Sequence, residues 1–352
     1  MAVRRAAWRR WVGVLVGAAA LTTGGVLAGP ASAAPRAGPS PSGTLRLGYF
    51  PNVTHAPALV GVQGGLFHDA LGPHVSLKLF TFNAGPAAVE ALLSDSIDAS
   101  YMGPNPAINA YAQSHGAVRI VAGAASGGAF LVVRPGITSA ADLKGKVLAT
   151  PQLGNTQDVA LRTWLRQRGL QTTTTGGGDV SIRPEDNGST VQAFEQHLLD
   201  GAWVPEPYAS ELVAAGGKVL VDERTLWPGG RFATTELVVR TDFLRSHAAI
   251  VQRLIQGQQD AIGVIDNDAG HAEQLVGQAI QSATGQSVKA STTAAGFQSI
   301  TFTNDPLAAT VRTQALDAQR LGLLAKTNLS GLFDLTILNT LLRSAGKPTV
   351  SS

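Results

Sequence analysis

The first patterned segment of the chain reads Leu45-Arg-Leu-Gly-Tyr-Phe-Pro-Asn-Val-Thr-His-Ala-Pro57, a short β-rich run that leads directly into a helix start. Residues 45–50 predict a strand, and Pro57 suits the first turn of a helix that we expect over 57–67. A strand followed closely by a helix is the repeating unit of α/β folds. This stretch therefore favours the α/β class.

The same alternation continues along the chain in two series. The first series adds expected strands over 75–82, 99–102 and 119–124 and helices over 85–93 and 106–114. The second has strands over 130–134, 147–150, 180–183, 202–204 and 218–221 and helices over 156–168 and 191–199. A last strand over 235–240 precedes helices over 248–265, 272–282, 307–321 and 335–344. Strands spaced by helices in this way predict right-handed crossovers and mostly parallel sheets.

Two series and a helical end predict two lobes joined by two crossings of the chain. We expect residues 44–128 to form the first segment of lobe I, 129–231 to form lobe II, and 232–352 to return to lobe I and supply a helical C-terminal tail. Each lobe would be a mostly parallel sheet flanked by helices, with the ligand between the lobes. The crossings, near 128–129 and 231–235, would act as hinges.

The N-terminus has the order of a secretory signal. Four arginines precede an apolar run over 11–28, which is followed by the small-residue triplet Ala31-Ser32-Ala33. This order predicts cleavage after Ala33 and an exported protein. An uncleaved membrane anchor is the alternative, because the run is nearly long enough to span a bilayer, and the arginine pairs leave a twin-arginine export route open. Residues 34–43 are rich in Pro, Gly and Ser and read as a flexible leader.

The charge and cysteine content exclude several classes of function. The whole chain has 27 Lys and Arg against 24 Asp and Glu, but four arginines belong to the signal, so 23 basic residues face 24 acidic ones after cleavage. This balance predicts no nucleic-acid partner. The chain has no cysteine, which excludes disulfides, thiol catalysis, zinc-thiolate sites and a lipid anchor on an N-terminal Cys. We expect no metal or cofactor.

Five segments, in order along the chain, resemble the periplasmic-type binding proteins of sulfonate, taurine and nitrate importers. They are 45–57, Met102-Gly-Pro-Asn-Pro-Ala107, Asp142-Leu-Lys-Gly-Lys146, Thr150-Pro-Gln-Leu-Gly-Asn-Thr-Gln157 and Asp200-Gly-Ala-Trp-Val-Pro-Glu-Pro207. The resemblance covers about 44–240, and the helical tail matches in pattern only. It implies a type II periplasmic-binding-protein fold, a small anionic ligand, an ABC transporter permease as partner, and a monomer. The Cys that usually carries lipid in this family is missing, so membrane tethering is not expected.

In lobe I, the expected ligand contacts lie where strands end and helices begin. Asn52 or Thr54 can cap the first helix, and the positive end of that helix would face an anion. His55 is equally compatible with a polar residue at the cleft edge. Gly103 permits close approach after the third strand, and Asn105 is placed as the cap of the next helix. For all of these residues, a purely structural capping role is the alternative.

In lobe II, Gly154-Asn155-Thr156-Gln157 opens the long helix, and its amide and hydroxyl groups are expected to close onto the anion from the opposite side. Asp158 complements that helix end and has no expected ligand role. Trp203 would stack on the organic part of the ligand. Glu206 would meet a positive group, as in taurine, or else serve only as an acid before the helix start at Pro207.

Small residues at the two crossings complete the expected site. Ser126 and Gly127 could present a hydroxyl and N–H groups to an oxyanion, or form only a turn, and Thr234 could be a hinge residue or an oxyanion contact. The full expected set is Asn52, Thr54, His55, Gly103, Asn105, Ser126, Gly127, Asn155, Thr156, Gln157, Trp203, Glu206 and Thr234.

Catalytic motifs are absent from the sequence. There is no Gly-x-Ser-x-Gly elbow, P-loop, Gly-x-Gly-x-x-Gly or His-Glu-x-x-His. We therefore predict a non-enzymatic, exported solute-binding component of an ABC importer whose ligand is an aliphatic sulfonate or taurine. Nitrate, bicarbonate, phosphonate and pyrimidine remain alternative ligands of the same fold. A secreted hydrolase and a non-transport sensor or adhesin remain alternative functions.

Overall fold

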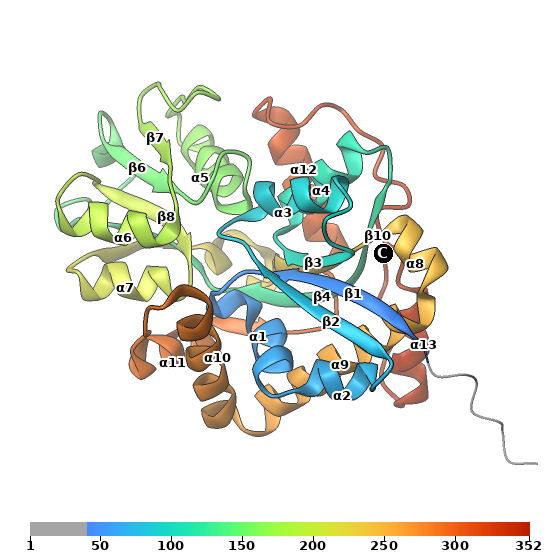
Figure 1. The fold of residues 1–352 in the computed structure, drawn as a ribbon. Coiled ribbons are helices and arrows are strands. Elements are labelled where there is room, and N and C mark those ends of the chain that lie inside the picture. Colours follow the sequence, from blue (N-terminus) through green and yellow to red (C-terminus); the bar gives the residue numbers. More distant parts are fainter. Residues whose placement is uncertain (1–40) are drawn as a thin grey trace, which may run out of the picture. The chain divides into compact units, whose positions relative to one another are not determined.

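The structure is a computed structural model that describes residues 41–352. The signal segment, its cleavage after Ala33 and most of the leader lie outside the described residues. Within 41–352, no helix has both the length and the apolar character needed to cross a membrane. Two sheets organise this part of the chain (Figure 1).

The first sheet, in lobe I, has the strand order β11-β4-β10-β3-β1-β2. Its strands are β1 (Gly43–Tyr49), β2 (Val75–Thr81), β3 (Ala99–Met102), β4 (Val118–Gly127), β10 (Ala233–Arg240) and β11 (Ile300–Phe302). The second sheet, in lobe II, has the order β7-β6-β8-β5-β9. Its strands are β5 (Ala129–Val133), β6 (Val147–Thr150), β7 (Ser181–Pro184), β8 (Gly201–Pro205) and β9 (Lys218–Asp222). The α/β class and the two-lobed arrangement are thus confirmed.

Helices flank both sheets. Lobe I carries the one-turn η1 (Val53–His55), α1 (Ala56–Gln63), α2 (Leu66–Leu71), α3 (Gly85–Leu93) and α4 (Pro104–Gln113). Lobe II carries η2 (Ala141–Leu143), α5 (Thr156–Gln167), α6 (Asn187–Glu195), α7 (Tyr208–Ala214), η3 (Glu223–Leu226) and η4 (Pro228–Gly230). The tail consists of α8 (Thr241–Ser246), α9 (Ala248–Asn267), α10 (Ala269–Thr284), α11 (Ala290–Ser299), α12 (Ala308–Arg320) and α13 (Thr336–Ser344).

Most strands of each sheet run in the same direction, as expected, but both sheets also contain strands that run the opposite way. β1 pairs in parallel with β2 and β3, but β10 is antiparallel to both β3 and β4. In lobe II, β5 is likewise antiparallel to β8 and β9. β5 and β10 are the first strands after the two crossings. Each enters its sheet at the edge where the neighbouring strands end, so it has to run in the opposite direction.

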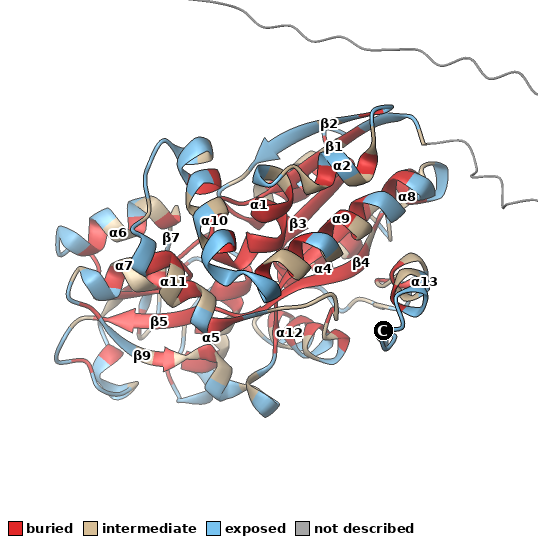
Figure 2. Ribbon diagram, turned by 90° about the horizontal axis from the view of Figure 1, so that it is seen from below, coloured by how far each residue is buried: buried red, intermediate tan, exposed pale blue. Residues whose placement is uncertain are grey.

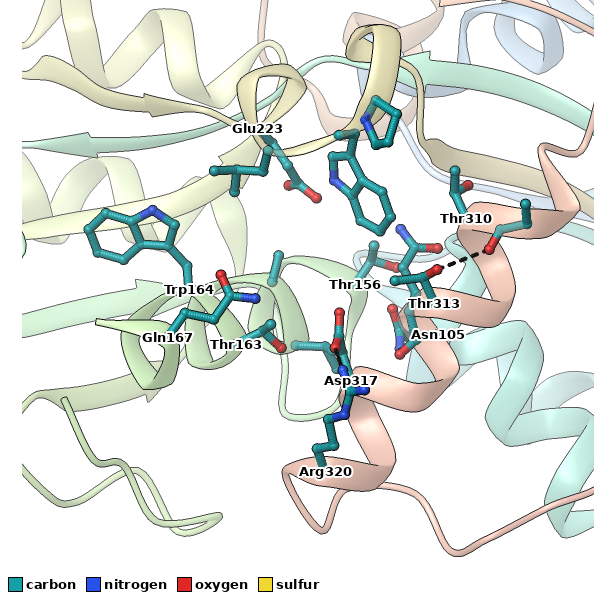
Figure 3. Close-up of a pocket in the computed structure, with 17 residues that line it drawn as sticks. Asn105, Thr156, Thr163, Trp164, Gln167, Glu223, Thr310, Thr313, Asp317 and Arg320 are labelled. Atoms are coloured by element: carbon teal, nitrogen blue, oxygen red, sulfur yellow. Dashed lines mark hydrogen bonds and ion pairs between the residues drawn. The ribbon is translucent and has the colours of Figure 1, made fainter. Parts of the chain in front are cut away.

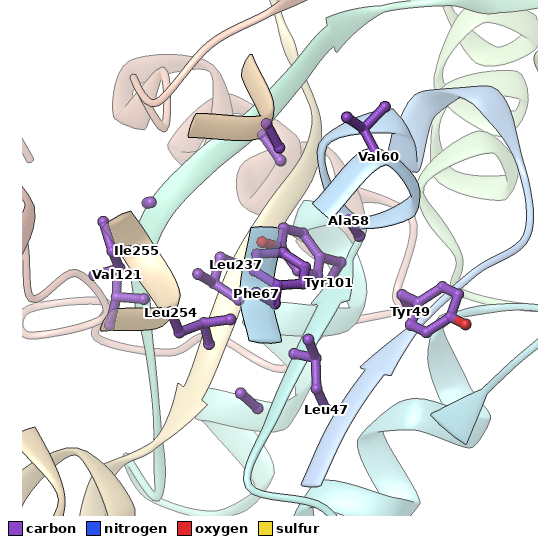
Figure 4. Packing of buried hydrophobic residues seen from close by; sticks show 14 of the residues in the cluster. Leu47, Tyr49, Ala58, Val60, Phe67, Tyr101, Val121, Leu237, Leu254 and Ile255 are labelled. Carbon is purple, nitrogen blue, oxygen red and sulfur yellow. The ribbon is translucent and has the colours of Figure 1, made fainter. Parts of the chain in front are cut away.

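The core of lobe I lies between its sheet and the helices α1, α2, α9 and α10. Figure 4 shows Phe67, Tyr101 and Leu237 packed together at its centre, and all three side chains are fully buried. Figure 2 shows most of the labelled strands buried, except β2 at the edge of its sheet, while the outer faces of the surrounding helices are exposed. The burial of these apolar side chains holds the sheet and helices together and so fixes the positions of the strand ends beside the site.

Several expected boundaries moved for local reasons. The single helix expected over 57–67 is broken into α1 and α2 at Gly64 and Gly65, because Gly65 has a left-handed φ of 73° that ends a helix. The helix expected over 191–199 begins at Asn187 instead, because the Asp186 side chain accepts hydrogen bonds from the N–H groups of Gly188 and Ser189. Three short elements, α8, α11 and β11, were not expected from the sequence.

Candidate functional site

The loop after β1 satisfies its polar groups internally. Asn52 caps η1, and its Oδ1 accepts hydrogen bonds from the Thr54 N–H at 3.1 Å and the Thr54 hydroxyl at 2.7 Å. Both side chains are buried. Asn52 and Thr54 therefore hold the loop in shape, and the Thr54 hydroxyl proton is already donated to Asn52.

His55 is buried and uncharged. Its Nδ1 accepts a hydrogen bond from the Phe50 N–H at 3.2 Å, and its ring stacks on that of Phe50 with centroids 4.4 Å apart. Burial lowers the pKa of His55 to about 3. Because Nδ1 is an acceptor, the proton of the neutral ring lies on Nε2, which makes His55 a neutral N–H donor.

The start of α4 corrects one expectation. Asn105 does not cap this helix, because the helix begins at Pro104, two residues before the expected start at 106, with Gly103 as its N-cap. Proline suits this first position, since its fixed φ is helical and its missing N–H would be unpaired there. Asn105 instead lies inside the first turn, where its Nδ2 donates to the Gln314 backbone carbonyl at 3.2 Å.

The start of α5 offers free donors. Asn155 is its N-cap but makes no capping hydrogen bond, and its Nδ2 lies 3.4 Å from Gln157 Oε1. Within residues 41–352, the backbone N–H groups of Thr156 and Gln157 meet no acceptor, and neither does the Thr156 hydroxyl. All three side chains are at most 6% exposed. Unpaired donors at a helix N-terminus are suited to an anion.

Asp158 supports this helix start from inside lobe II. Its carboxylate accepts hydrogen bonds from Arg162 Nε at 2.9 and 3.0 Å, the Thr150 hydroxyl at 3.0 Å and the Gly154 N–H at 2.9 Å. Asp158 and Arg162 are both buried. Asp158, which was expected only to complement the helix end, thus also forms a buried ion pair with Arg162 and holds the 154–156 turn in place.

The two lobes touch where α4 and α5 begin. A Cβ placed on Gly103 would collide with the Thr156 hydroxyl, and one on Gly85 would lie 3.2 Å from Asn155 Oδ1. Glycine is needed at 103 for this approach, whereas at 85 it is needed mainly because a Cβ would collide with Pro106 of the same lobe. The structure therefore brings together Gly103, Asn105, Asn155 and Thr156 from opposite lobes.

A cavity of about 400 Å³ opens beside this contact, between α5 of lobe II and α12 of the tail (Figure 3). Its polar wall includes Asn105, Thr156, Thr163 and Gln314, and the Asp317–Arg320 ion pair, at 3.1 Å, also lines it. Its apolar wall is formed by Val159, Ala160, Trp164, Leu226, Trp227 and Pro228. The volume lies in the range of small-molecule sites.

Hydrogen bonds join the end of β4, at Ser126 and Gly127, to the start of β10, at Thr234. The Ser126 hydroxyl accepts a hydrogen bond from the Phe232 N–H at 3.1 Å, and the Thr234 hydroxyl donates to the Gly127 carbonyl at 2.7 Å. Gly127 and Gly128 have positive φ values of 89° and 73°. These residues join the two crossings of the chain, and none of them lines the 400 Å³ cavity.

Trp203 lies in the core of lobe II and does not line the cavity. It is fully buried, its ring meets Trp164 edge-on at 6.3 Å, and its Nε1 donates to Glu223 Oε2 at 2.8 Å. Its neighbour Glu223 does line the cavity. Burial raises the pKa of Glu223 to about 8, so this carboxyl is largely protonated at neutral pH.

Glu206 faces a different hollow from Thr156. It is buried and accepts hydrogen bonds from the Ser210 N–H at 3.1 Å and the Ser210 hydroxyl at 2.9 Å. Burial raises its pKa to about 7. Glu206 lines a separate hollow of about 330 Å³ with Phe130 and Thr292, while Asn52 lines a third of about 250 Å³. Four of the expected residues, Asn52, Asn105, Thr156 and Glu206, thus line three separate hollows.

Sequence reasoning missed the contribution of the tail and of the second crossing. Gln314, Glu223 and Trp227 line the cavity but lie outside every segment that carried the resemblance. One signal was available for Gln314, which is a polar residue on the apolar stripe of α12 beside the buried Val311 and Ala315. A polar residue on such a stripe requires a buried partner or a ligand.

Comparison with known proteins gives both a family and a fold. A model of the NMT1-like family matches residues 38–279. A relative from Brucella abortus (strain 2308), provisionally named as a binding protein, is 28% identical over 222 residues. The alignment covers 62% of this chain and 65% of the relative, which is less than two thirds of the relative's length.

Solved structures share the two-lobed architecture. The alkanesulfonate-binding protein SsuA from Xanthomonas axonopodis pv. citri, bound to MOPS, matches with a TM-score of 0.66 at 20% identity and covers 82% of this chain and 96% of its own. The periplasmic nitrate-binding protein NrtA from Synechocystis PCC 6803 matches with a TM-score of 0.71 at 15% identity, covering 87% and 90%. The fold is therefore that of periplasmic binding proteins.

Proposed function

This chain belongs to the NMT1-like family, and from that premise we propose that it is the exported solute-binding component of an ABC importer. Its ligand is a small organic anion, an organosulfonate, which lies between the lobes. The partners are this ligand and a transporter permease. In this role the chain binds its ligand and releases it unchanged.

The start of α5 carries the proposal. Thr156 presents an unpaired hydroxyl at the lobe contact, and Thr156 and Gln157 each have a backbone N–H group that is unpaired within the described residues. An anion at this point would receive charge-assisted hydrogen bonds, which are stronger than neutral ones. It would also gain about 0.3–2 kcal/mol from the positive end of the helix.

The neutrality of the donors favours a fully ionised acid as ligand. Thr156 and Gln157 provide O–H and N–H groups without a formal positive charge. A sulfonate offers only acceptors and needs no proton from the site. The alkanesulfonate named for SsuA and the nitrate named for NrtA are both anions of this kind, which supports the choice of class.

Titration calorimetry of the purified chain against methanesulfonate, taurine, nitrate, bicarbonate and methylphosphonate tests the proposal. We expect a sulfonate to bind with at least tenfold preference over the other anions, without any turnover of the ligand. Tightest binding of another anion in the panel would reassign the ligand class. Heat or product release that shows hydrolysis would exclude a transport-only role.

A further inference from the structure

We infer that the 400 Å³ cavity between α5 and α12 holds the organic part of the ligand and selects a flat ring that carries an N–H donor. The inference rests on the proposed function, because it places the anionic group of the same molecule at Thr156. It differs from the expectation for Glu206, which lines another hollow. The selecting groups are two amide oxygens.

The orientation of these amides is fixed by their own hydrogen bonds. Asn105 Nδ2 donates to the Gln314 carbonyl at 3.2 Å, and Gln314 Nε2 donates to the Ala233 carbonyl at 3.0 Å. Rotating either amide would put an oxygen against a carbonyl oxygen. Asn105 Oδ1 and Gln314 Oε1 are therefore the free ends, and neither has a donor among residues 41–352.

Both amides are buried to an extent that makes unpaired oxygens costly. Asn105 is 2% exposed and Gln314 is 4% exposed, and both line the cavity. A buried acceptor without a donor costs about 1–3 kcal/mol. Oxygen acceptors repel an anion but accept a hydrogen bond from an amine. They therefore define the end of the cavity that receives N–H groups.

The remaining wall suits a ring. Trp227 and Leu226 come from the second crossing, and Val159 and Trp164 come from α5. The Trp164 Nε1 is buried and has no acceptor in the described part of the chain. Aromatic and aliphatic walls with a few fixed polar groups are typical of sites for ring-bearing molecules. A ligand as small as taurine would leave most of this wall uncovered.

A series of three probes separates the anionic group, the ring and the donor. Methanesulfonate carries the anionic group alone, benzenesulfonate adds the ring, and 4-aminobenzenesulfonate adds N–H donors. We expect the ring to strengthen binding by at least tenfold, since roughly 100 Å² of apolar surface is buried. The amine should add roughly fivefold. Calorimetry and the fluorescence of Trp164 and Trp227 provide two readouts.

A filling variant locates the effect. Thr313 lines the cavity from an exposed position on α12, so Thr313→Trp should occupy the space of the ring. It should abolish the tighter binding of benzenesulfonate relative to methanesulfonate, while the affinity for methanesulfonate should stay within about twofold of that of the unmodified chain. Leu316→Trp, on the same helix but away from the cavity, is the matched control. Thermal unfolding checks that both variants fold. The ratio of the affinities for benzenesulfonate and methanesulfonate in the unmodified chain tests the inference even if a variant does not fold.

The outcomes distinguish failure of the inference from failure of the proposed function. Equal affinity for methanesulfonate and benzenesulfonate, or equal weakening of all probes by Thr313→Trp, would overturn the inference and leave anion binding intact. If no anion binds, the proposed function fails. Binding of aniline that Thr313→Trp abolishes would then reveal a ring site without an anionic group, which also overturns the linked ligand.

Discussion

Thr156 combines three features that sequence alone could not bring together. Its hydroxyl is unpaired within the described residues, it begins α5, and it contacts Gly103 of the other lobe. The sequence predicted the residue as a ligand contact from its position at a helix start. It could not predict the contact with Gly103, because that contact depends on how the two lobes meet.

Replacing the Thr156 hydroxyl should weaken every anionic ligand alike. Thr156→Val keeps the shape of the side chain but removes a donor to a charged acceptor, which costs about 1.5–3 kcal/mol, or about tenfold to a hundredfold in affinity. Thr156→Ser retains the hydroxyl and should bind nearly as well as the unmodified chain. Calorimetry with methanesulfonate and benzenesulfonate measures both variants. Unchanged affinity in Thr156→Val would remove the start of α5 from the site.

Glu223 should make stability depend on pH. Burial raises its pKa from 4.5 to about 8, so the folded chain holds this proton more tightly than the unfolded chain does. The resulting stabilisation is complete below about pH 4.5 and is lost as pH rises through about 8. The total loss in the free energy of unfolding across this pH range is about 2–5 kcal/mol.

The variant Glu223→Gln removes this titration but keeps an acceptor for Trp203. Its stability relative to the unmodified chain should therefore rise steadily between pH 5 and pH 8, as measured by urea unfolding. Glu90→Gln, at an exposed position on α3, is the control and should show no such trend. Parallel stability curves for Glu223→Gln and the unmodified chain would mean that Glu223 is ionised in the fold.

The elements of lobe I and lobe II were largely predictable from local signals. The strand expected over 99–102 matches β3, and the helix expected over 156–168 ends one residue after α5. β11 and α11 were not predictable, because a three-residue strand has too few residues to show a period and the buried residues of α11 are mainly Thr, Gly and Ser. Strand direction after each crossing also escaped prediction, since it depends on which edge the chain enters.

Glycines inside and between helices should respond oppositely to alanine. Gly263 in α9 and Gly277 in α10 have helical neighbours, and no atom lies within 4 Å of the point that an added Cβ would occupy, so alanine should raise the free energy of unfolding by about 0.5–1 kcal/mol at each. Gly65 is equally open but has a φ of 73°. Gly65→Ala should lower stability by about 1–2 kcal/mol.

Urea unfolding of the three alanine variants measures these differences. Because an added methyl group meets no neighbour at any of the three positions, a difference between them reports backbone strain and not packing. Stabilisation by Gly65→Ala would show that α1 and α2 can join into the single helix expected from the sequence. Destabilisation by Gly263→Ala or Gly277→Ala would mean that the added methyl group clashes with a neighbour, which contradicts the open space that the structure shows around both residues.

The lobes of residues 41–352 are in contact in this structure, and their only covalent links are the crossings near Gly128 and between β9 and β10. Ser126 and Thr234 bond these two crossings together, which makes them suited to act as one hinge. A ligand that touches Thr156 on one lobe and Asn105 on the other interacts with both only when the lobes are closed. We therefore predict that the ligand-free protein opens and that the ligand closes it.

Because the sequence has no cysteine, two introduced cysteines can carry spin labels without background labelling. A pair at Ser94 in lobe I and Leu198 in lobe II, both exposed, should show a broad distance distribution without ligand and a shorter, narrower one at saturation. A pair at Ser94 and Lys326, both on the lobe I side, should not change. A shift from mostly open to mostly closed requires about 10⁴-fold tighter binding to the closed form than to the open form, so a sulfonate with a smaller preference for the closed form should leave both populations visible at saturation. If a saturating, tightly bound sulfonate leaves the Ser94–Leu198 distribution unchanged, the crossings do not bend and the ligand enters a site that is already formed.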